Sequence, residues 1–232
     1  MKITAIVPIK KDSERVPGKN HRLLNGKPLY TIILDTLQAC NTIEHIIVNT
    51  DCADMGNKIA LAYNKAIVIE RPVHLLGNHI SANQLIANDI DKGKSDHFLQ
   101  THCTNPLLTQ KTITGAINQY FNTLSAHDSL LSVSPIRARL YNNNKTPYNH
   151  KAGEMLRTQD MDVVYKENSS FFIFSRQSFL KAGNNRVGLT PAVFEMSEIE
   201  SVDIDYENDF LLAELIDKNR NLFPDIFGSQ AK

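Results

Sequence analysis

The sequence predicts an α/β fold with a mostly parallel β-sheet covered by helices on both faces. Two observations lead to this prediction: short apolar runs alternate with segments of helical period, and their spacing is typical of right-handed βαβ units. The composition agrees, because 232 residues, 42% hydrophobic and 22% charged, suffice for a domain with a real core. We therefore predict a single domain over residues 1–232.

The predicted strands are apolar runs bounded by polar or turn residues: 3–9, 45–50, 66–70, 96–102, 129–135, 169–175 and 199–205. Between them, apolar residues recur at helical spacing in the predicted helices 29–40, 53–64, 81–91, 109–122 and 205–219. Thr109 is the expected N-cap of the helix that follows it. In 137–163 the pattern gives way to polar, Asn-rich sequence. We interpret this segment as an excursion from the sheet, either a dimerisation arm or a flexible surface insertion.

Composition limits the possible partners. The chain carries 25 Lys and Arg against 25 Asp and Glu, so the broad positive excess of a nucleic-acid-binding protein is missing. The three cysteines are odd in number and widely spaced, which disfavours a disulfide framework and a zinc site. No apolar run reaches the length of a signal segment or membrane span, so we expect a cytoplasmic protein without a membrane partner.

A basic loop follows the first predicted strand. It carries five basic side chains, opposed locally only by two acidic ones: Lys10, Lys11, Arg15, Lys19 and Arg22 against Asp12 and Glu14. In open α/β sheets, ligands bind outside the carboxyl ends of the strands, where this loop begins. Neither a P-loop nor a dinucleotide-binding glycine pattern is present. The basic groups and the backbone around Ser13 and Gly18 could hold a polyphosphate. Taken alone, a solvated basic loop is the simpler interpretation.

Two carboxylates, Asp203 and Asp205, lie two residues apart in the last predicted strand and would point to the same face. Adjacent carboxylates repel each other unless a cation lies between them, and Mg²⁺ accepts such oxygen ligands together with waters and substrate phosphates. The alternative is that Asp205 caps the final helix. Combined with the basic loop, the pair favours nucleotidyl transfer, which must neutralise charge on the α-phosphoryl oxygens and on departing pyrophosphate.

Five segments, in order along the chain, are similar to the acylneuraminate cytidylyltransferase family, the CMP-sialic acid synthetases and their relatives. They are AIVPIKKDSERVPGKNHRLLNGKPL (5–29), ERPVHLLGN (70–78), LQTHCTNPLLT (99–109), RTQDMDVVYKENSSFFIFS (157–175) and SVDIDYENDFLLAE (201–214). The resemblance implies a Rossmann-like, three-layer α/β/α nucleotidyltransferase fold related to the GT-A type, usually homodimeric. It also implies Mg²⁺-dependent transfer of a cytidylyl group from CTP to the anomeric hydroxyl of a nonulosonic acid, giving the CMP-sugar and pyrophosphate.

The resemblance also implies roles for individual residues. Those expected to bind the nucleotide are Lys10, Ser13, Lys19, Asn20, Arg71 and Ser81, of which the three cations would also be catalytic. Those expected to face the sugar acid are Gln100, His102, Thr104, Arg157, Gln159 and Asn168. Asp203 and Asp205 match the metal pair. We expect Lys19 and Arg71 to be exposed, so that replacing them would leave folding nearly unchanged.

The chain also departs from the family pattern. Lys10 stands where the family usually has arginine, Leu108 replaces the last arginine of its Q-P-T-S-P-L-R motif, and Asn168-Ser169-Ser170 replaces its N-G-A. The identity of the acid therefore stays open. The alternatives are an enzyme like CMP-KDO synthetase acting on another ulosonic acid, or a non-catalytic nucleotide-binding homologue. A GT-A glycosyltransferase is disfavoured because only a short segment follows the carboxylate pair.

Overall fold

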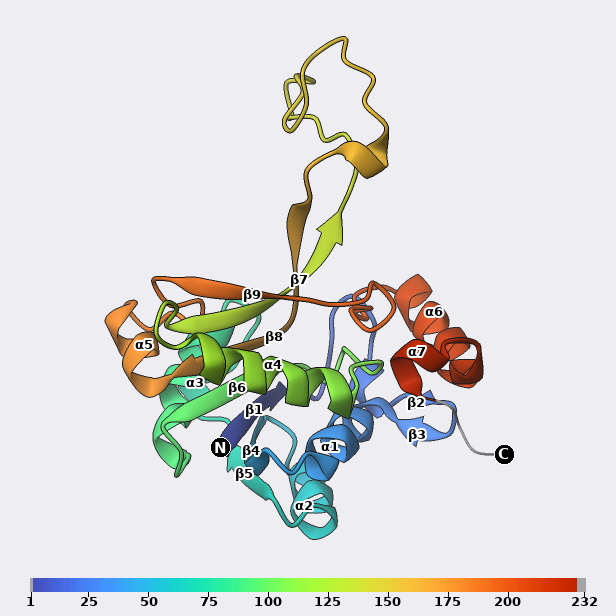
Figure 1. The fold of residues 1–232 in the computed structure, drawn as a ribbon. Helices are drawn as coiled ribbons and strands as arrows, with labels where there is room; N and C mark the ends of the chain where they lie inside the picture. Colours follow the sequence, from blue (N-terminus) through green and yellow to red (C-terminus); the bar gives the residue numbers. More distant parts are fainter. Residues whose placement is uncertain (1, 229–232) are drawn as a thin grey trace.

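Seven strands form the central sheet of the computed structural model, which describes residues 2–228, in the order β5-β4-β1-β6-β8-β7-β9 (Figure 1). Their bounds are β1 Ile3–Ile9, β4 Ile43–Thr50, β5 Ala66–Glu70, β6 His97–Thr101, β7 Ser129–Ile136, β8 Val164–Ser175 and β9 Pro191–Glu195. All of these strands run parallel except β8, which pairs antiparallel with both β6 and β7. A separate hairpin joins β2 (Leu23–Leu24) to β3 (Lys27–Pro28).

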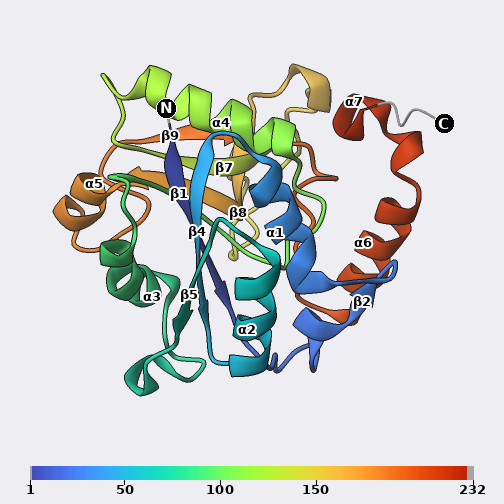
Figure 2. The same ribbon diagram turned by 90° about the horizontal axis from the view of Figure 1, so that it is seen from below.

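Helices cover both faces of the sheet, as Figures 1 and 2 show. Their bounds are α1 Leu29–Ala39, α2 Ala53–Ala62, α3 Ala82–Asp89, α4 Gln110–Thr123, α5 Arg176–Lys181, α6 Glu207–Lys218 and α7 Pro224–Phe227. Side chains of α1, α2 and α4 pack into one core cluster, and those of α3 and α5 pack into another on the opposite face. This three-layer arrangement is the predicted one. None of the helices in the described part of the chain has the length and apolar character needed to cross a membrane.

The sheet reverses its direction of growth at β1. From β1 the chain proceeds to β4 and β5 on one side, and it then returns to place β6 on the other side of β1. The loops that leave the carboxyl ends of β1 and β6 therefore diverge, and a crevice opens between them at this switch point. The first strand forms because its apolar run is buried almost throughout, as expected for a central parallel strand.

The predicted strand at 199–205 is wrong. Residues 198–201 form a turn and the backbone from 202 to 205 pairs with no strand, while the unpredicted β9 takes the edge position beside β7. The segment is instead held across the carboxyl edge, where the Ile204 N–H donates to the Thr104 carbonyl at 2.9 Å. The predicted N-cap is confirmed: the Thr109 hydroxyl accepts the Thr112 N–H at 3.2 Å.

The excursion 137–163 extends from β7 and β8, whose outer ends pair with each other, and stands away from the sheet (Figure 1). Within it, Arg137 Nη1 donates to the Met161 carbonyl at 2.8 Å, and a β-bridge joins Tyr141 to Pro147. All residues from 151 to 160 are exposed. The dimerisation role predicted for this arm stays a prediction.

Candidate active site

A cavity of about 560 Å³ opens at the switch point, on the carboxyl edge of the sheet. Its walls come from the loop after β1, the residue after β5, the start of α3, the segment after β6, and the 203–205 segment. Nine of the residues predicted from the sequence line it: Lys10, Ser13, Lys19, Asn20, Arg71, His102, Thr104, Asp203 and Asp205. Residues far apart in the sequence therefore line one cavity.

Lys19 and Asn20 close the basic loop onto the sheet. Gly18 has a φ of 63°, in the left-handed region that favours glycine, and it turns the chain into a short 3-10 helix. Asn20 Nδ2 donates to the Lys10 carbonyl at 2.7 Å, which ties the two ends of the loop together. Lys19 is only 7% exposed and donates from Nζ to the Ile204 carbonyl. The expectation of an exposed Lys19 is therefore wrong, because this lysine links the loop to the carboxylate segment.

Arg71 is also buried, 5% exposed, between the ends of three strands. Its Nε donates to Asn49 Oδ1 at 2.7 Å, and its Nη2 donates to the carbonyls of Asn49 and Ile9 at 3.0 and 3.2 Å. Nη1 lies 3.8 Å from Asp51 Oδ2. Burial lowers the pKa of Arg71, although the charges of Asp51 and Asp89 oppose that shift. The expected exposed arginine is wrong here too, because Arg71 ties strand ends together while it lines the cavity.

The carboxylate pair faces the cavity although it does not lie in a strand. Asp203 and Asp205 flank the fully buried Ile204, and both line the cavity. Burial raises the pKa of Asp203, and the negative charge of Asp205 adds to this effect. Asp205 does not cap α6, because the Asp209 carboxylate accepts the N–H groups of Asp205 and Tyr206 at 3.0 and 2.7 Å.

The pair fits a hard divalent cation. Asp203 Oδ1 is buried without a hydrogen-bond partner, and a metal ion would satisfy this atom. Asp205 Oδ1 accepts a hydrogen bond from Arg15 Nη2 at 2.5 Å and lies 4.0 Å from Lys19 Nζ. No group of three or more His, Cys, Asp or Glu side chains within residues 2–228 could hold a metal by itself. A cation here would therefore need phosphate or water oxygens, as is typical of Mg²⁺.

His102 lies in the cavity wall. Burial, together with the positive charges of Arg186 and Lys19, lowers its pKa to about 4, so the ring is neutral at physiological pH. The neighbouring Cys103 donates from Sγ to Asn20 Oδ1 at 3.2 Å, and burial raises its pKa to about 12. Cys103 therefore supports the loop and is not an activated nucleophile. Gln100 lies behind His102, fully buried.

Two predicted residues lie next to the cavity and support its walls. The Ser81 hydroxyl accepts the Gln84 N–H at 3.3 Å, so Ser81 is the N-cap of α3. Asn168 Nδ2 donates to Ser134 Oγ at 3.1 Å, and the cavity is lined by its neighbour Ser169 instead. Both side chains therefore hold parts of the wall in place, and neither is among the residues that line the cavity.

Two others lie far from the cavity along the arm. Arg157 and Gln159 belong to its exposed outer part. The Arg157 guanidinium forms a two-pronged ion pair with Asp160, with Nε donating at 2.6 Å and Nη2 at 3.0 Å. The structure of a single chain therefore does not bring them together with the other predicted sugar-facing residues.

Comparison with known proteins assigns the family. A family model described as cytidylyltransferase matches residues 4–226, nearly the whole chain. The chain belongs to the cytidylyltransferase family.

Several relatives resemble this cytidylyltransferase over most of its length. It is 28% identical over 229 residues to the CMP-N,N'-diacetyllegionaminic acid synthase of Legionella pneumophila, covering 92% of this chain and 95% of the relative. It is 26% identical over 223 residues to post-translational flagellin modification protein B of Campylobacter coli, covering 90% and 92%. Other curated relatives are named N-acylneuraminate cytidylyltransferase and pseudaminic acid cytidylyltransferase. These findings confirm the resemblance described from the sequence.

A solved structure confirms the predicted nucleotidyltransferase fold. The CMP:2-keto-3-deoxy-manno-octonic acid synthetase complexed with CTP superposes on this cytidylyltransferase with a TM-score of 0.71 at 12% identity. The superposition covers 95% of this chain and 100% of the other.

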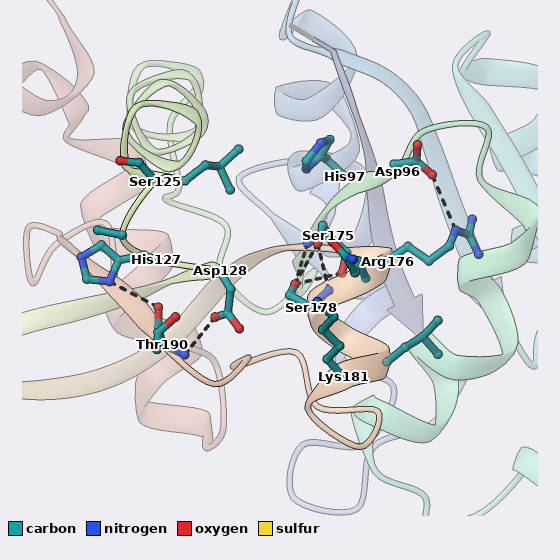
Figure 3. Close-up of a pocket in the computed structure, with 14 residues that line it drawn as sticks. Asp96, His97, Ser125, His127, Asp128, Ser175, Arg176, Ser178, Lys181 and Thr190 are labelled. Atoms are coloured by element: carbon teal, nitrogen blue, oxygen red, sulfur yellow. Dashed lines mark hydrogen bonds and ion pairs between the residues drawn. The ribbon is translucent and has the colours of Figure 1, made fainter.

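The cytidylyltransferase has a second, larger depression of about 810 Å³ at the opposite, amino edge of the sheet (Figure 3). Several of its charged groups are bound within the protein: Asp96 Oδ1 lies 3.9 Å from Arg176 Nε, and the Asp128 carboxylate accepts the Thr190 N–H at 3.0 Å. His127 Nδ1 lies 3.3 Å from the Thr190 carbonyl. None of the predicted site residues lines this depression, so size alone does not mark the site.

Two arginines of the cytidylyltransferase have no site role predicted from the sequence: Arg15, which lines the active-site cavity, and Arg186, which lies beside it. The sequence places Arg15 only in the basic loop, and the structure shows that it pairs with Asp205. Arg186 lies after α5 in the Asn- and Gly-containing segment NNRVG (184–188), and its Nη1 donates to Gln100 Oε1 at 2.6 Å. A lone arginine between Asn and Gly residues was the only sequence signal for it.

Proposed function

We propose that this protein transfers a cytidylyl group from CTP to the anomeric hydroxyl of a nonulosonic acid and releases pyrophosphate. One observation carries the proposal: a single cavity at the switch point is lined by the predicted catalytic cations Lys10, Lys19 and Arg71 and by the carboxylates Asp203 and Asp205. The acceptor class follows from the relatives, which are named for legionaminic, N-acylneuraminic and pseudaminic acids.

In this reaction the anomeric oxygen forms a bond to the α-phosphorus while the bond from that phosphorus to pyrophosphate breaks. The hydroxyl proton passes to water. Negative charge accumulates on the α-phosphoryl oxygens and on the leaving group, so fixed cations beside them lower the barrier. Lys19 and Arg71 are held in place by carbonyls of the sheet edge and of the carboxylate segment, so little reorganisation is needed during the reaction.

Mg²⁺ dependence is part of the proposal. Asp203 and Asp205 would hold the ion, which would neutralise phosphate charge when bound. The unpartnered Oδ1 of Asp203 supports this assignment. Arg15 already binds Asp205, so a cation there would compete with this ion pair.

We also propose a cytoplasmic homodimer. The three cysteines are free and buried, in agreement with a reducing compartment. The arm carries exposed apolar side chains, among them Met155 at 83% and Leu156 at 51% exposure, which suit a protein interface. Light scattering at micromolar concentration measures the mass directly, and a monomer would contradict the dimer.

The test of the function is pyrophosphate release with Mg²⁺, one nucleotide at a time, and a panel of eight- and nine-carbon ulosonic acids. We expect turnover with CTP and not with ATP or GTP. Equal rates with GTP would refute the cytidylyl assignment and leave nucleotidyl transfer standing. Binding of CTP without turnover on any acid would indicate the non-catalytic homologue.

A further inference from the structure

Arg186 occupies a fixed position beside the cavity. Its guanidinium lies over the ring of Phe172, 3.9 Å from the ring centroid, and its Nη1 donates to Gln100 Oε1 at 2.6 Å. Its backbone N–H donates to Asn83 Oδ1 of α3 at 3.3 Å. Contacts with two strands and one helix therefore hold this loop arginine in place.

The charge of Arg186 has no acidic partner. No carboxylate of residues 2–228 lies within 4.0 Å of its guanidinium, and only Glu167 acts on it from a distance. Burial lowers the pKa of Arg186 to about 10, which reflects the cost of holding this cation without a counter-ion. The other two arginines of the site each have an acidic partner: Arg15 pairs with Asp205, and Arg71 lies near Asp51.

One edge of the Arg186 guanidinium is free. Its Nε and Nη2 make no hydrogen bond in the described structure, and neither is among the polar atoms sealed from solvent. These two nitrogens form the side edge of the planar group, the edge that can donate to both oxygens of one carboxylate.

A chain of hydrogen bonds connects Arg186 to the cavity. Because arginine has only donors, Gln100 must present its oxygen to Arg186, and its Nε2 then donates to the Thr101 carbonyl at 3.0 Å. The same Nε2 lies 3.1 Å from His102 Nε2, so that ring nitrogen must be the acceptor. Arg186 thereby fixes the amide of Gln100 and the tautomer of His102, which lines the cavity.

We propose that Arg186 binds the carboxylate of the acceptor acid, in a subsite that adjoins the nucleotide cavity and has Gln100 and His102 as its wall. This inference rests on the proposed function for the identity of the acid. It assigns the carboxylate to a residue of the same chain, in place of Arg157, which is exposed on the arm and paired with Asp160.

The free edge of Arg186 could bind two oxygens of a carboxylate or two oxygens of a phosphate. The triphosphate of CTP is therefore the alternative ligand for this arginine. Lys10, Lys19 and Arg71 line the nucleotide cavity and are the cations proposed to bind phosphate. Arg186 is not among the residues that line that cavity and reaches His102 only through Gln100, so we assign it to the second substrate. Steady-state kinetics with each substrate varied in turn distinguishes the two anions.

The experiment compares Arg186→Gln and Arg186→Lys with the parent protein. Losing a two-pronged charged contact should raise KM for the acid by roughly tenfold or more, with KM for CTP within about twofold. Lysine keeps the charge without the fork, so its effect should be intermediate. Arg176→Gln is the matched control, because Arg176 also lies over a phenylalanine but pairs with Asp91 and Asp96.

A binding measurement keeps the inference testable without turnover. Ligand-observed NMR compares N-acetylneuraminic acid with its carboxamide, which lacks the charge. The parent and Arg176→Gln should prefer the acid, and Arg186→Gln should lose that preference while keeping the parent's melting temperature within a few degrees. An unchanged preference in Arg186→Gln, or a rise in KM for CTP alone, would overturn the inference. Absence of turnover in the parent would contradict the proposed function only, because the acid-versus-amide comparison still decides the role of Arg186.

Discussion

Replacing Arg71 by methionine should destabilise the fold and reduce turnover together. The substitution keeps most of the side-chain volume but removes three hydrogen bonds to Asn49 and Ile9 at 2.7–3.2 Å. Each buried acceptor left without a donor costs about 1–3 kcal/mol, while removing a buried cation returns part of that cost. We therefore expect a net loss of about 3 kcal/mol in the free energy of unfolding. For a chain of this size the melting temperature should fall by about 9 °C.

The activity of the same variant should fall by roughly 10²-fold, the scale of losing one group that stabilises the transition state. Thermal unfolding by circular dichroism gives the first number, and pyrophosphate release well below the melting temperature gives the second. Lys10→Met is the matched control: its Nζ contacts only Asn78 Oδ1 at 2.9 Å and the Gly77 carbonyl at 3.5 Å, both on the surface. It should lose activity with a stability change of about 0.5 kcal/mol or less.

The two readouts separate the possible errors in this reasoning. An Arg71→Met protein with the parent's melting temperature would refute the structural role that its buried contacts indicate. A protein that melts earlier but turns over normally would show that Arg71 only ties the strands together.

Two further predictions concern the walls of the cavity. Mg²⁺ with CTP should raise the melting temperature of the parent in proportion to saturation, and Asp203→Asn and Asp205→Asn should lose this gain and most turnover. Glu207→Gln is the control and should keep both, because Glu207, at the start of α6, binds Arg22 of the basic loop. A retained gain in either Asn variant would contradict the metal assignment. His102 has a folded pKa of about 4, below its ordinary value, so the parent should lose up to roughly 3 kcal/mol of stability as pH falls from about 6.5 to 4. His102→Gln should remove that acid-side loss, and identical pH profiles of unfolding would contradict it.

The sequence predicts the fold well where periodicity is strong. The run of β1 and the capped start of α4 carry clear signals, and both elements lie where the pattern puts them. The strand predicted at 199–205 is wrong because alternating apolar and polar residues indicate which side chains are buried. They do not indicate whether another strand lies beside the backbone to pair with it. Ile204 is buried, but by the hairpin and α6, while β9, begun by a proline at the sheet edge, takes the pairing position.

In the candidate site too, some features could be predicted from the sequence and others could not. Lys19 and Arg71 could be predicted because the segments that carry them resemble the family's motifs, and Lys19 also belongs to the basic loop after the first predicted strand. Their burial could not, because it depends on the carbonyls of Ile204, Asn49 and Ile9, which are supplied by distant segments. Phe172 lies in the predicted strand 169–175, and the structure adds the Arg186 guanidinium that lies over its ring.

The distribution of charge explains how a chain of zero net charge can hold polyanionic substrates. Arg15 is neutralised by Asp205, and Arg71 is partly neutralised by Asp51, so these two mainly shape the cavity when it is empty. Among residues 2–228, Lys10 and Arg186 have only neutral hydrogen-bond partners, Asn78 and Gly77 for the first and Gln100 for the second, so no carboxylate pairs directly with either charge. An arriving anion gains most from cations that no carboxylate already satisfies. Lys10 lies in the wall of the cavity and Arg186 lies beside it, linked to His102 through Gln100, an arrangement that suits two separate anionic substrates.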